Sequence, residues 1–226
     1  MKGTRQATAG ETVKSTRERV REEAAALFRE RGYNGTSMSE LARRVGITKS
    51  SLYHHFPSKQ ALLAEIIELT VNRVTPLVEE VAASEAPVAE RLRRVVAIHT
   101  VEAIRDQDAV ACFTEEGRYL SPEFMVALVA KRDDYERIFR QILTEGILAG
   151  EFLPQDADLT VKGILGMCNS AVRWYRPTGP YTPEELADRF ARFAVTGVSG
   201  TPDRAGTGTG ADPAPGPIQT SEALVR

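Results

Sequence analysis

Residues 36–59 read TSMSELARRVGITKSSLYHHFPSK, a pattern that predicts two short helices joined by a tight turn. Ser37 and Glu40 fit a capping box at the start of the first helix. Gly46 stands where a glycine commonly ends a helix, and Thr48 can cap the helix that follows. Two short helices around such a turn form a helix-turn-helix arrangement.

The outer face of the second predicted helix is free of carboxylates. It carries short hydroxyls, one cation and flat rings, namely Lys49, Ser50, Ser51, Tyr53 and His54. DNA phosphates repel carboxylates and attract lysines and helix N-termini. This composition therefore favours a recognition helix that approaches DNA.

The charge of the chain is divided unevenly along its length. Residues 1–60 contain 12 Lys and Arg against 6 Asp and Glu, and the remaining residues contain 17 against 25. A basic head on an acidic body indicates that only the head meets a polyanion. The alternative is a chance clustering of charges on a solvated surface.

The sequence on both sides of the motif places its apolar residues at helical spacing. No segment shows the alternation of a strand, and there is no internal repeat. The predicted fold class is therefore all-α, with an N-terminal three-helix helix-turn-helix domain, a larger C-terminal helical domain and about nine helices. Besides the two short helices, the predicted helices span residues 13–31, 59–83, 87–106, 108–118, 121–150, 156–175 and 182–197.

Four regions follow from these boundaries. We expect a disordered arm over residues 1–12, a head over 13–60, a body over 61–197 and a disordered tail over 198–226. The tail is rich in glycine and proline and almost without apolar residues, which is typical of segments that cannot bury a core.

Composition excludes several classes of protein. No apolar run approaches the ~18 residues that span a bilayer, and no apolar segment near the N-terminus predicts a secretory signal. Cys112 and Cys168 lack the spacing of a zinc site or a disulfide framework, and no nucleotide-binding or hydrolase motif is present. We therefore expect a cytoplasmic protein that is not an enzyme, has no catalytic residue, cofactor or metal site, and contacts no membrane.

The runs TSM (36–38), GIT (46–48) and LYHHFPSK (52–59) closely resemble the TetR family of bacterial transcriptional repressors, with a match over about residues 14–63. The resemblance implies a homodimer whose two heads enter successive major grooves of a palindromic double-stranded DNA operator. It also implies that the C-terminal domain binds a small-molecule inducer and forms the dimer. The ligand would move the heads apart and release the DNA.

By motif position, the resemblance implies two sets of DNA contacts. Thr36, Ser37, Tyr53, His55 and Lys59 would hold phosphates, and Lys49, Ser50, Ser51 and His54 would face base edges. Many relatives have Gly or Pro near positions 50 and 51, where this chain has two serines, so the base contacts stay open. The alternatives are a Tyr53 ring that only packs, a surface pair of histidines, and a solvated Lys59.

A second cluster lies near the C-terminus, where the single tryptophan stands between two arginines in the run RWYR (173–176). A large ring beside two guanidiniums suits an amphipathic anion such as an acyl chain on a phosphorylated carrier. The stretch also resembles the TetR subgroup that controls fatty-acid and steroid breakdown, whose members respond to acyl-coenzyme A (acyl-CoA) thioesters. The predicted ligand-binding residues are Phe113, Tyr135, Asn169, Arg173, Trp174 and Arg176.

Two alternatives to this ligand assignment stay open. Trp174 could pack at the end of the dimer helices while both arginines pair with acids. The chain could also repress an efflux or catabolic operon that is induced by a neutral lipophilic molecule. His99 is interpreted as a core or surface histidine rather than as a ligand contact.

The helices expected at 156–175 and 182–197 carry apolar stripes and are predicted to form a four-helix dimer interface. The stripes consist of Val161, Ile164, Leu165, Cys168 and Val172 on one helix and Leu186, Phe190, Phe193 and Ala194 on the other. The alternative functions are an enzyme of unknown reaction and a constitutive architectural DNA-binding protein. A constitutive architectural protein would leave the acidic helical body without a role.

Overall fold

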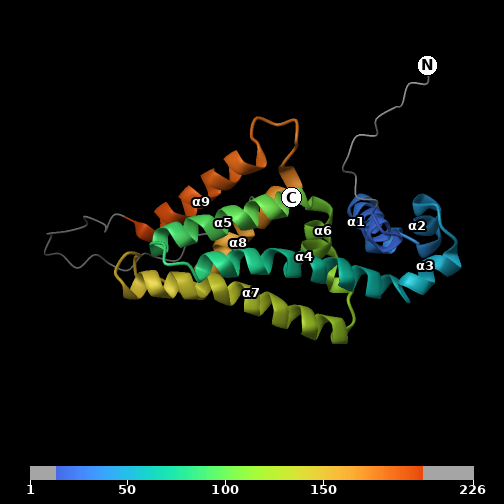
Figure 1. Cartoon of the computed structure of the whole chain (residues 1–226), viewed down its shortest axis with the longest axis horizontal. Coiled ribbons are helices and arrows are strands. Elements are labelled where there is room, and N and C mark those ends of the chain that lie inside the picture. The colour runs from blue at the N-terminus through green and yellow to red at the C-terminus, as the bar shows by residue number, and fades with distance from the viewer. Residues whose placement is uncertain (1–13, 201–226) are drawn as a thin grey trace, which may run out of the picture.

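The computed structural model describes residues 14–200, and this part of the chain consists of helices and loops without a strand. The predicted all-α fold is confirmed, with nine α-helices among the described residues (Figure 1). They are α1 (Thr16–Gly35), α2 (Met38–Val45), α3 (Lys49–His55), α4 (Lys59–Ala82), α5 (Val88–Arg105), α6 (Gln107–Ala111), α7 (Pro122–Leu148), α8 (Ala157–Trp174) and α9 (Pro183–Ser199). A π-helical turn, η1 (Cys112–Glu116), and a 3-10 turn, η2 (Gly117–Tyr119), join α6 to α7. The predicted arm over 1–12 and residues 201–226 of the predicted tail lie outside the described residues.

Local sequence signals set the boundaries of the three head helices. Gly32 interrupts α1 with a left-handed φ of 73°, and Gly46 ends α2 with a φ of 78°. A residue with a Cβ would be strained at either position. Ser37 and Thr48 cap α2 and α3, because each side chain accepts a hydrogen bond from the backbone N–H three residues on. The caps and the left-handed glycine therefore fix the angle at which α3 leaves the turn.

Helix α4 is shared by two hydrophobic cores. Its first half, residues 62–67, packs with the head helices and with Ala109 and Cys112 of the α6–η1 segment. Its second half, residues 74–81, belongs to the core of the body. Figure 1 shows the head at one end of α4, and α7 running along it. The head and the body are therefore joined by a continuous helix, and the predicted boundary at residues 60–61 falls at the start of that helix.

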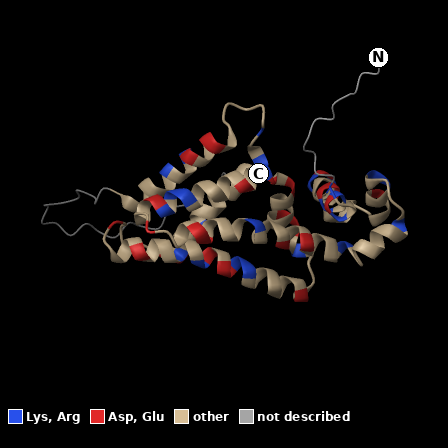
Figure 2. Ribbon diagram, viewed as in Figure 1, with Lys and Arg blue, Asp and Glu red and all other residues tan. Residues whose placement is uncertain are grey.

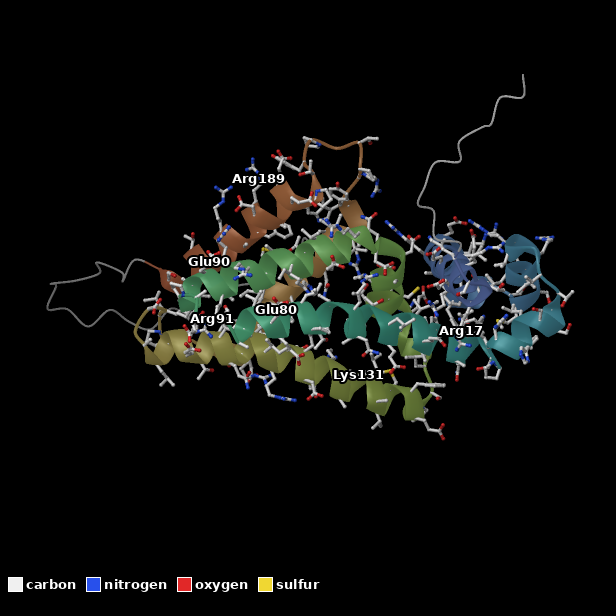
Figure 3. All side chains as sticks on the ribbon, viewed as in Figure 1. Arg17, Glu80, Glu90, Arg91, Lys131 and Arg189 are labelled. Atoms are coloured by element: carbon white, nitrogen blue, oxygen red, sulfur yellow. The ribbon has the colours of Figure 1, made fainter. Side chains whose placement is uncertain are left out.

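Helix α5 lies at the centre of the body and packs against α4, α7, α8 and α9. At the end of the body far from the head, Arg91 donates hydrogen bonds to the carbonyl oxygens of Ala82 and Ala86 and pairs with Glu145 of α7 (Figure 3). These contacts fasten the α4–α5 connection to α7. None of the described helices is long and apolar enough to cross a membrane.

Several predicted boundaries differ from the structure. The helix predicted over 13–31 spans Thr16–Gly35 and continues across the kink at Gly32. The helix predicted over 108–118 is the five-residue α6, followed by the π-helical and 3-10 turns. In this segment the Thr114 hydroxyl donates to the carbonyl oxygen of Val110. Residues 198 and 199 of the predicted tail belong to α9, because this helix continues to Ser199 and Val198 is buried.

Most of the apolar stripe assigned to the dimer interface is instead buried inside the single chain. The buried members are Val161, Ile164, Leu165, Cys168, Val172, Leu186 and Ala194. Phe190 is half-buried beside Trp174, and Phe193 alone among the predicted interface residues is largely exposed. Spacing identifies an apolar face, but it does not say whether α5 or a second chain covers that face.

Candidate DNA-binding surface and ligand cavity

Helix α3 is anchored by one buried side chain and presents its other residues outward. Leu52 is fully buried in the head core. Lys49, Ser50, Tyr53 and His54 are exposed. The structure therefore brings the predicted base-facing residues together on one accessible surface, with Ser51 and His55 half-buried at its edges.

Lys49 and Tyr53 are an exposed cation and an exposed ring on this surface. The Lys49 Nζ lies 5.9 Å from the centre of the Tyr53 ring, which is 42% exposed. Lys49 makes no ion pair with another described residue. Helix α3 contains no acidic residue, whereas α5, α7 and α9 mix both signs of charge (Figure 2). The ammonium group is therefore available to a phosphate or a base edge.

Arg17 of α1 braces the end of the recognition helix. Its guanidinium donates to the carbonyl oxygen of His55 at 2.8 Å and pairs with Glu65 of α4. It also stacks on the Phe56 ring, with the guanidinium carbon 4.4 Å from the ring centre (Figure 3). These contacts hold α3 between α1 and α4, so that the surface keeps its shape.

Thr36 and Lys59 face inward in the structure. Thr36 is 3% exposed, and its hydroxyl donates to the carbonyl oxygens of Leu27 at 3.2 Å and Gly32 at 3.1 Å. The Lys59 Nζ donates to the carbonyl oxygens of Tyr33 at 2.7 Å and Thr36 at 2.8 Å. Partial burial accordingly lowers the pKa of Lys59. The phosphate role expected of the Thr36 side chain is therefore corrected, and Lys59 fastens the α1–α2 connection to α4.

A cavity of about 100 Å³ lies in the body, bounded by residues of α4, α5, α6, η1, α7 and α8. Its wall is mostly apolar and includes Val71, Val74, Ala103, Val110, Phe113 and Leu165. Phe113, Tyr135 and Asn169, three of the predicted ligand-binding residues, all line it. A mostly apolar cavity with a few converging polar groups is the usual form of a small-molecule site.

Three polar side chains from three helices form a hydrogen-bonded chain on the cavity wall. The His99 Nδ1 lies 2.9 Å from the Tyr135 hydroxyl, and the His99 Nε2 lies 3.1 Å from the Asn169 Oδ1. Burial lowers the pKa of His99 to about 4 and raises that of Tyr135. All three groups are therefore uncharged at neutral pH. His99 is satisfied as an interior histidine and also lines the cavity, which the sequence interpretation did not expect.

Two arginines lie where the cavity approaches solvent. The side chains of Arg73 and Arg132 are 45% and 48% exposed. Arg73 pairs with Glu102 at 3.3 Å, and Arg132 pairs with Glu136 at 3.4 Å. All four residues line the cavity, so its rim carries two cations and two carboxylates.

The Arg-Trp-Tyr-Arg cluster does not line this cavity. Arg173 is 69% exposed and pairs with Glu115 of η1 at 3.0 Å. Trp174 is half exposed and meets the edge of Phe190, while Arg176 donates to the carbonyl oxygens of Arg173 and Tyr175. The two arginines expected at the pocket mouth therefore do not line this cavity, and their role in ligand binding stays a prediction. The acid that pairs with Arg173 is 58 positions away in sequence and could not be recognised from local composition.

The segment between α6 and α7 connects the cavity with the head. Phe113 lines the cavity, and the preceding Cys112 packs in the head core with its Sγ 3.9 Å from the Ala25 carbonyl oxygen. Arg29 of α1 pairs with Asp108 of α6 at 2.8 Å and donates to the Val172 carbonyl oxygen of α8. The segment that forms part of the cavity wall therefore also contacts α1 directly.

Two family models match the chain. The model of the bacterial regulatory proteins of the tetR family covers residues 20–66, and that of the tetracyclin repressor-like C-terminal domain covers residues 85–198. The chain belongs to the TetR family. It is a TetR-type transcriptional repressor with a ligand-binding domain, and not an enzyme.

Several relatives of this TetR-family chain are known. The HTH-type transcriptional repressor KstR2 of Mycobacterium tuberculosis is 30% identical over 190 residues, which cover 83% of this chain and 94% of KstR2. The structure of the ketosteroid transcriptional regulator KstR2 of that organism superposes with a TM-score of 0.77 at 28% identity, covering 84% of this chain and 98% of that chain. The structure of PfmR of Thermus thermophilus has a TM-score of 0.73 at 35% identity, covering 78% of this chain and 97% of the PfmR chain. AibR, in a crystal structure with isovaleryl coenzyme A and operator DNA, has a TM-score of 0.72 at 26% identity, covering 82% of this chain and 98% of the AibR chain.

Among the cavity residues that sequence reasoning about this TetR-type repressor missed are the histidine and the four charged residues, His99, Arg73, Glu102, Arg132 and Glu136. One signal for His99 was present, because its imidazole interrupts the buried stripe of α5. The four charged residues at the rim resemble any solvated helix face, and only the fold shows that they surround a cavity.

Proposed function

We propose that this chain represses transcription as a homodimer on a palindromic operator and leaves the operator when a small molecule fills the cavity. The observation that carries this proposal is the continuity between the two sites. Cys112 packs in the core that seats the recognition helix, and its neighbour Phe113 forms part of the cavity wall. A constitutive architectural protein would have no use for this connection.

The DNA contacts that we propose follow from exposure on the head. Lys49, Ser50, Ser51 and His54 are assigned to base edges, and Ser37, Tyr53 and His55 to phosphates. Lys49 and Tyr53 stand out because both are exposed and no carboxylate lies on α3. DNA selected from a random pool would supply the operator, and we expect the selected sequences to be palindromic. Fluorescence anisotropy with the Lys49→Ala variant would then test the assignment.

The dimer that we propose uses the outward faces of α8 and α9. Leu159 is 68% exposed and Phe193 70% exposed. Gly163 and Gly166 on α8 and Gly197 on α9 have open space beyond their Cα atoms, so a second chain can approach both helices closely. Two helices from each chain would form a four-helix interface around a two-fold axis.

The ligand that we propose is an acyl-CoA. The complex of AibR with isovaleryl coenzyme A supports this class, because AibR shares the fold over most of both chains. An engineered apolar cavity of about 150 Å³ holds benzene, so the cavity of about 100 Å³ suits a short acyl group. Arg73 and Arg132 at the rim are the cations nearest to this cavity, and we assign the phosphorylated end to them rather than to Arg173 and Arg176.

Calorimetry with short-chain acyl-CoAs and their free acids tests this assignment. We expect the thioesters to bind and the free acids to bind much more weakly. Arg73→Met with Arg132→Met should weaken thioester binding at least tenfold, whereas Arg173→Met with Arg176→Met should leave it unchanged. Equal binding of acids and thioesters would instead favour a neutral lipophilic inducer in the same apolar cavity.

A further inference from the structure

Each of the two hydrogen bonds that join Tyr135, His99 and Asn169 on the cavity wall has a defined donor and acceptor. The Asn169 Oδ1 can only accept a hydrogen bond, so the His99 Nε2 must donate to it. Because the imidazole is neutral, its Nδ1 then accepts from the Tyr135 hydroxyl. The chain of donors therefore runs from Tyr135 through His99 to Asn169.

This order leaves a free donor at one end of the chain. The Asn169 Nδ2 group makes no hydrogen bond to another described residue, and Asn169 lines the cavity. An amide N–H group on a mostly apolar wall favours a ligand oxygen that accepts a hydrogen bond.

The inner part of the cavity also selects against ionised groups. Burial holds the pKa of His99 at about 4, so this imidazole supplies no positive charge at neutral pH. The two arginines at the rim are about half exposed and already face Glu102 and Glu136. A carboxylate inside the cavity would lose its hydration without gaining a cation.

We propose that Asn169, held in place by His99 and Tyr135, recognises an uncharged carbonyl oxygen on the apolar part of the ligand. The thioester carbonyl lies where the acyl group joins coenzyme A, toward the rim, so the inducer class is then a short oxo-acyl thioester that carries a second carbonyl oxygen on its apolar part. This inference rests on the proposed ligand-responsive function and deepens it. In this arrangement His99 and Tyr135 are positioning residues, and Asn169 provides the contact.

Two matched pairs of ligands test the inference by calorimetry. The first pair is 4-oxopentanoyl-CoA and pentanoyl-CoA, which differ by one ketone oxygen. The second pair is cyclohexanone and methylenecyclohexane, which carry no coenzyme A. We expect the wild-type chain to prefer the ketone of each pair by about tenfold, the range of one hydrogen bond.

Variants of the chain test which residue produces the preference for the ketone of each pair. Asn169→Leu should reduce the ratio within each pair to about one, and Tyr135→Phe should reduce it in part because the imidazole loses its donor. Tyr175→Phe is the matched control, since Tyr175 is buried but does not line the cavity, and it should keep the full ratio. Thermal unfolding identifies the variants that fold, and Tyr135→Phe carries the test if Asn169→Leu does not fold.

The outcomes separate this inference from the proposed function. Equal binding within both pairs, or a full preference retained by Asn169→Leu, would overturn the inference while thioester binding still supports the proposed function. If neither thioester binds but cyclohexanone still binds more tightly than methylenecyclohexane, the acyl-CoA proposal fails and recognition of a carbonyl is supported.

Discussion

Replacement of Phe193 by aspartate tests the proposed dimer at its most exposed ring. Phe193 lies on the outward face of α9 and is 70% exposed in the single chain. A buried Phe removes about 150–250 Å² from water, so covering the exposed part of Phe193 would remove about 140 Å² in each copy. At about 25 cal/mol per Å², this burial is worth up to about 3.5 kcal/mol for each chain.

The substitution removes this burial twice in a symmetric dimer and adds two carboxylates to the contact. Because association also loses translational and side-chain freedom, only part of the area term is realised. We expect the dimer dissociation constant in sedimentation equilibrium to rise at least about a hundredfold. The separated chain should still fold cooperatively, because Phe193 supports no buried core. Its melting temperature should lie below that of the dimeric wild type, since the stabilisation by association is lost.

Val126→Asp is the matched control for this substitution. Val126 is 72% exposed on α7, away from α8 and α9, and it receives the same change of charge. It should leave the dimer intact. A wild-type dissociation constant for Phe193→Asp, or equal dissociation of both variants, would refute the placement of the interface.

Three further predictions concern the head and the cavity. Lys49→Ala should cost about 1–3 kcal/mol on the selected operator and little on random DNA in anisotropy titrations; an equal loss on both would assign Lys49 to phosphate. The pKa of His99 is about 4 in the folded chain and about 6.5 in the unfolded chain, so the unfolded state binds more protons between these pH values. The free energy of unfolding should therefore fall by up to about 3 kcal/mol as the pH drops through that window. Urea titrations should show no such fall in the free energy of unfolding for His99→Gln. An identical pH dependence of the wild type and this variant would exclude His99 as the source of the fall. Ala103→Leu adds three carbons to the cavity and should fill the space of the ligand. We expect this variant to retain its affinity for the operator in anisotropy titrations and to give no heat of ligand binding in calorimetry. Unchanged ligand binding would place the site elsewhere.

The head could be predicted from the sequence almost in full, because its signals are local. Caps, a left-handed glycine and the spacing of apolar residues each act within a few positions. Gly46 and Thr48 therefore appear in the structure as the sequence predicts. Ser37 caps α2, but Glu40 does not complete the predicted capping box, because its carboxylate pairs with Arg31. The other exceptions are Thr36 and Lys59, whose side chains donate to carbonyl oxygens that only the folded α1–α2 connection brings near.

The cavity could be predicted only in part, because its residues meet through packing of distant helices. Phe113, Tyr135 and Asn169 were found as apolar or polar residues on expected helices, but the hydrogen bonds to His99 span 36 and 70 positions. The pairing of Arg173 with Glu115 is equally remote in sequence. Composition marks such side chains as unusual, and the fold decides which of them share a site.

Release of labelled operator DNA on addition of ligand tests the central claim most directly. Fluorescence anisotropy would follow the selected palindrome, bound by the full chain, during titration with short-chain acyl-CoAs and their free acids. We predict that a thioester lowers the anisotropy to that of free DNA with the wild-type chain and leaves the Ala103→Leu complex intact. Operator that stays bound at saturating concentrations of every thioester, or an Ala103→Leu complex released as readily as the wild type, would contradict the account.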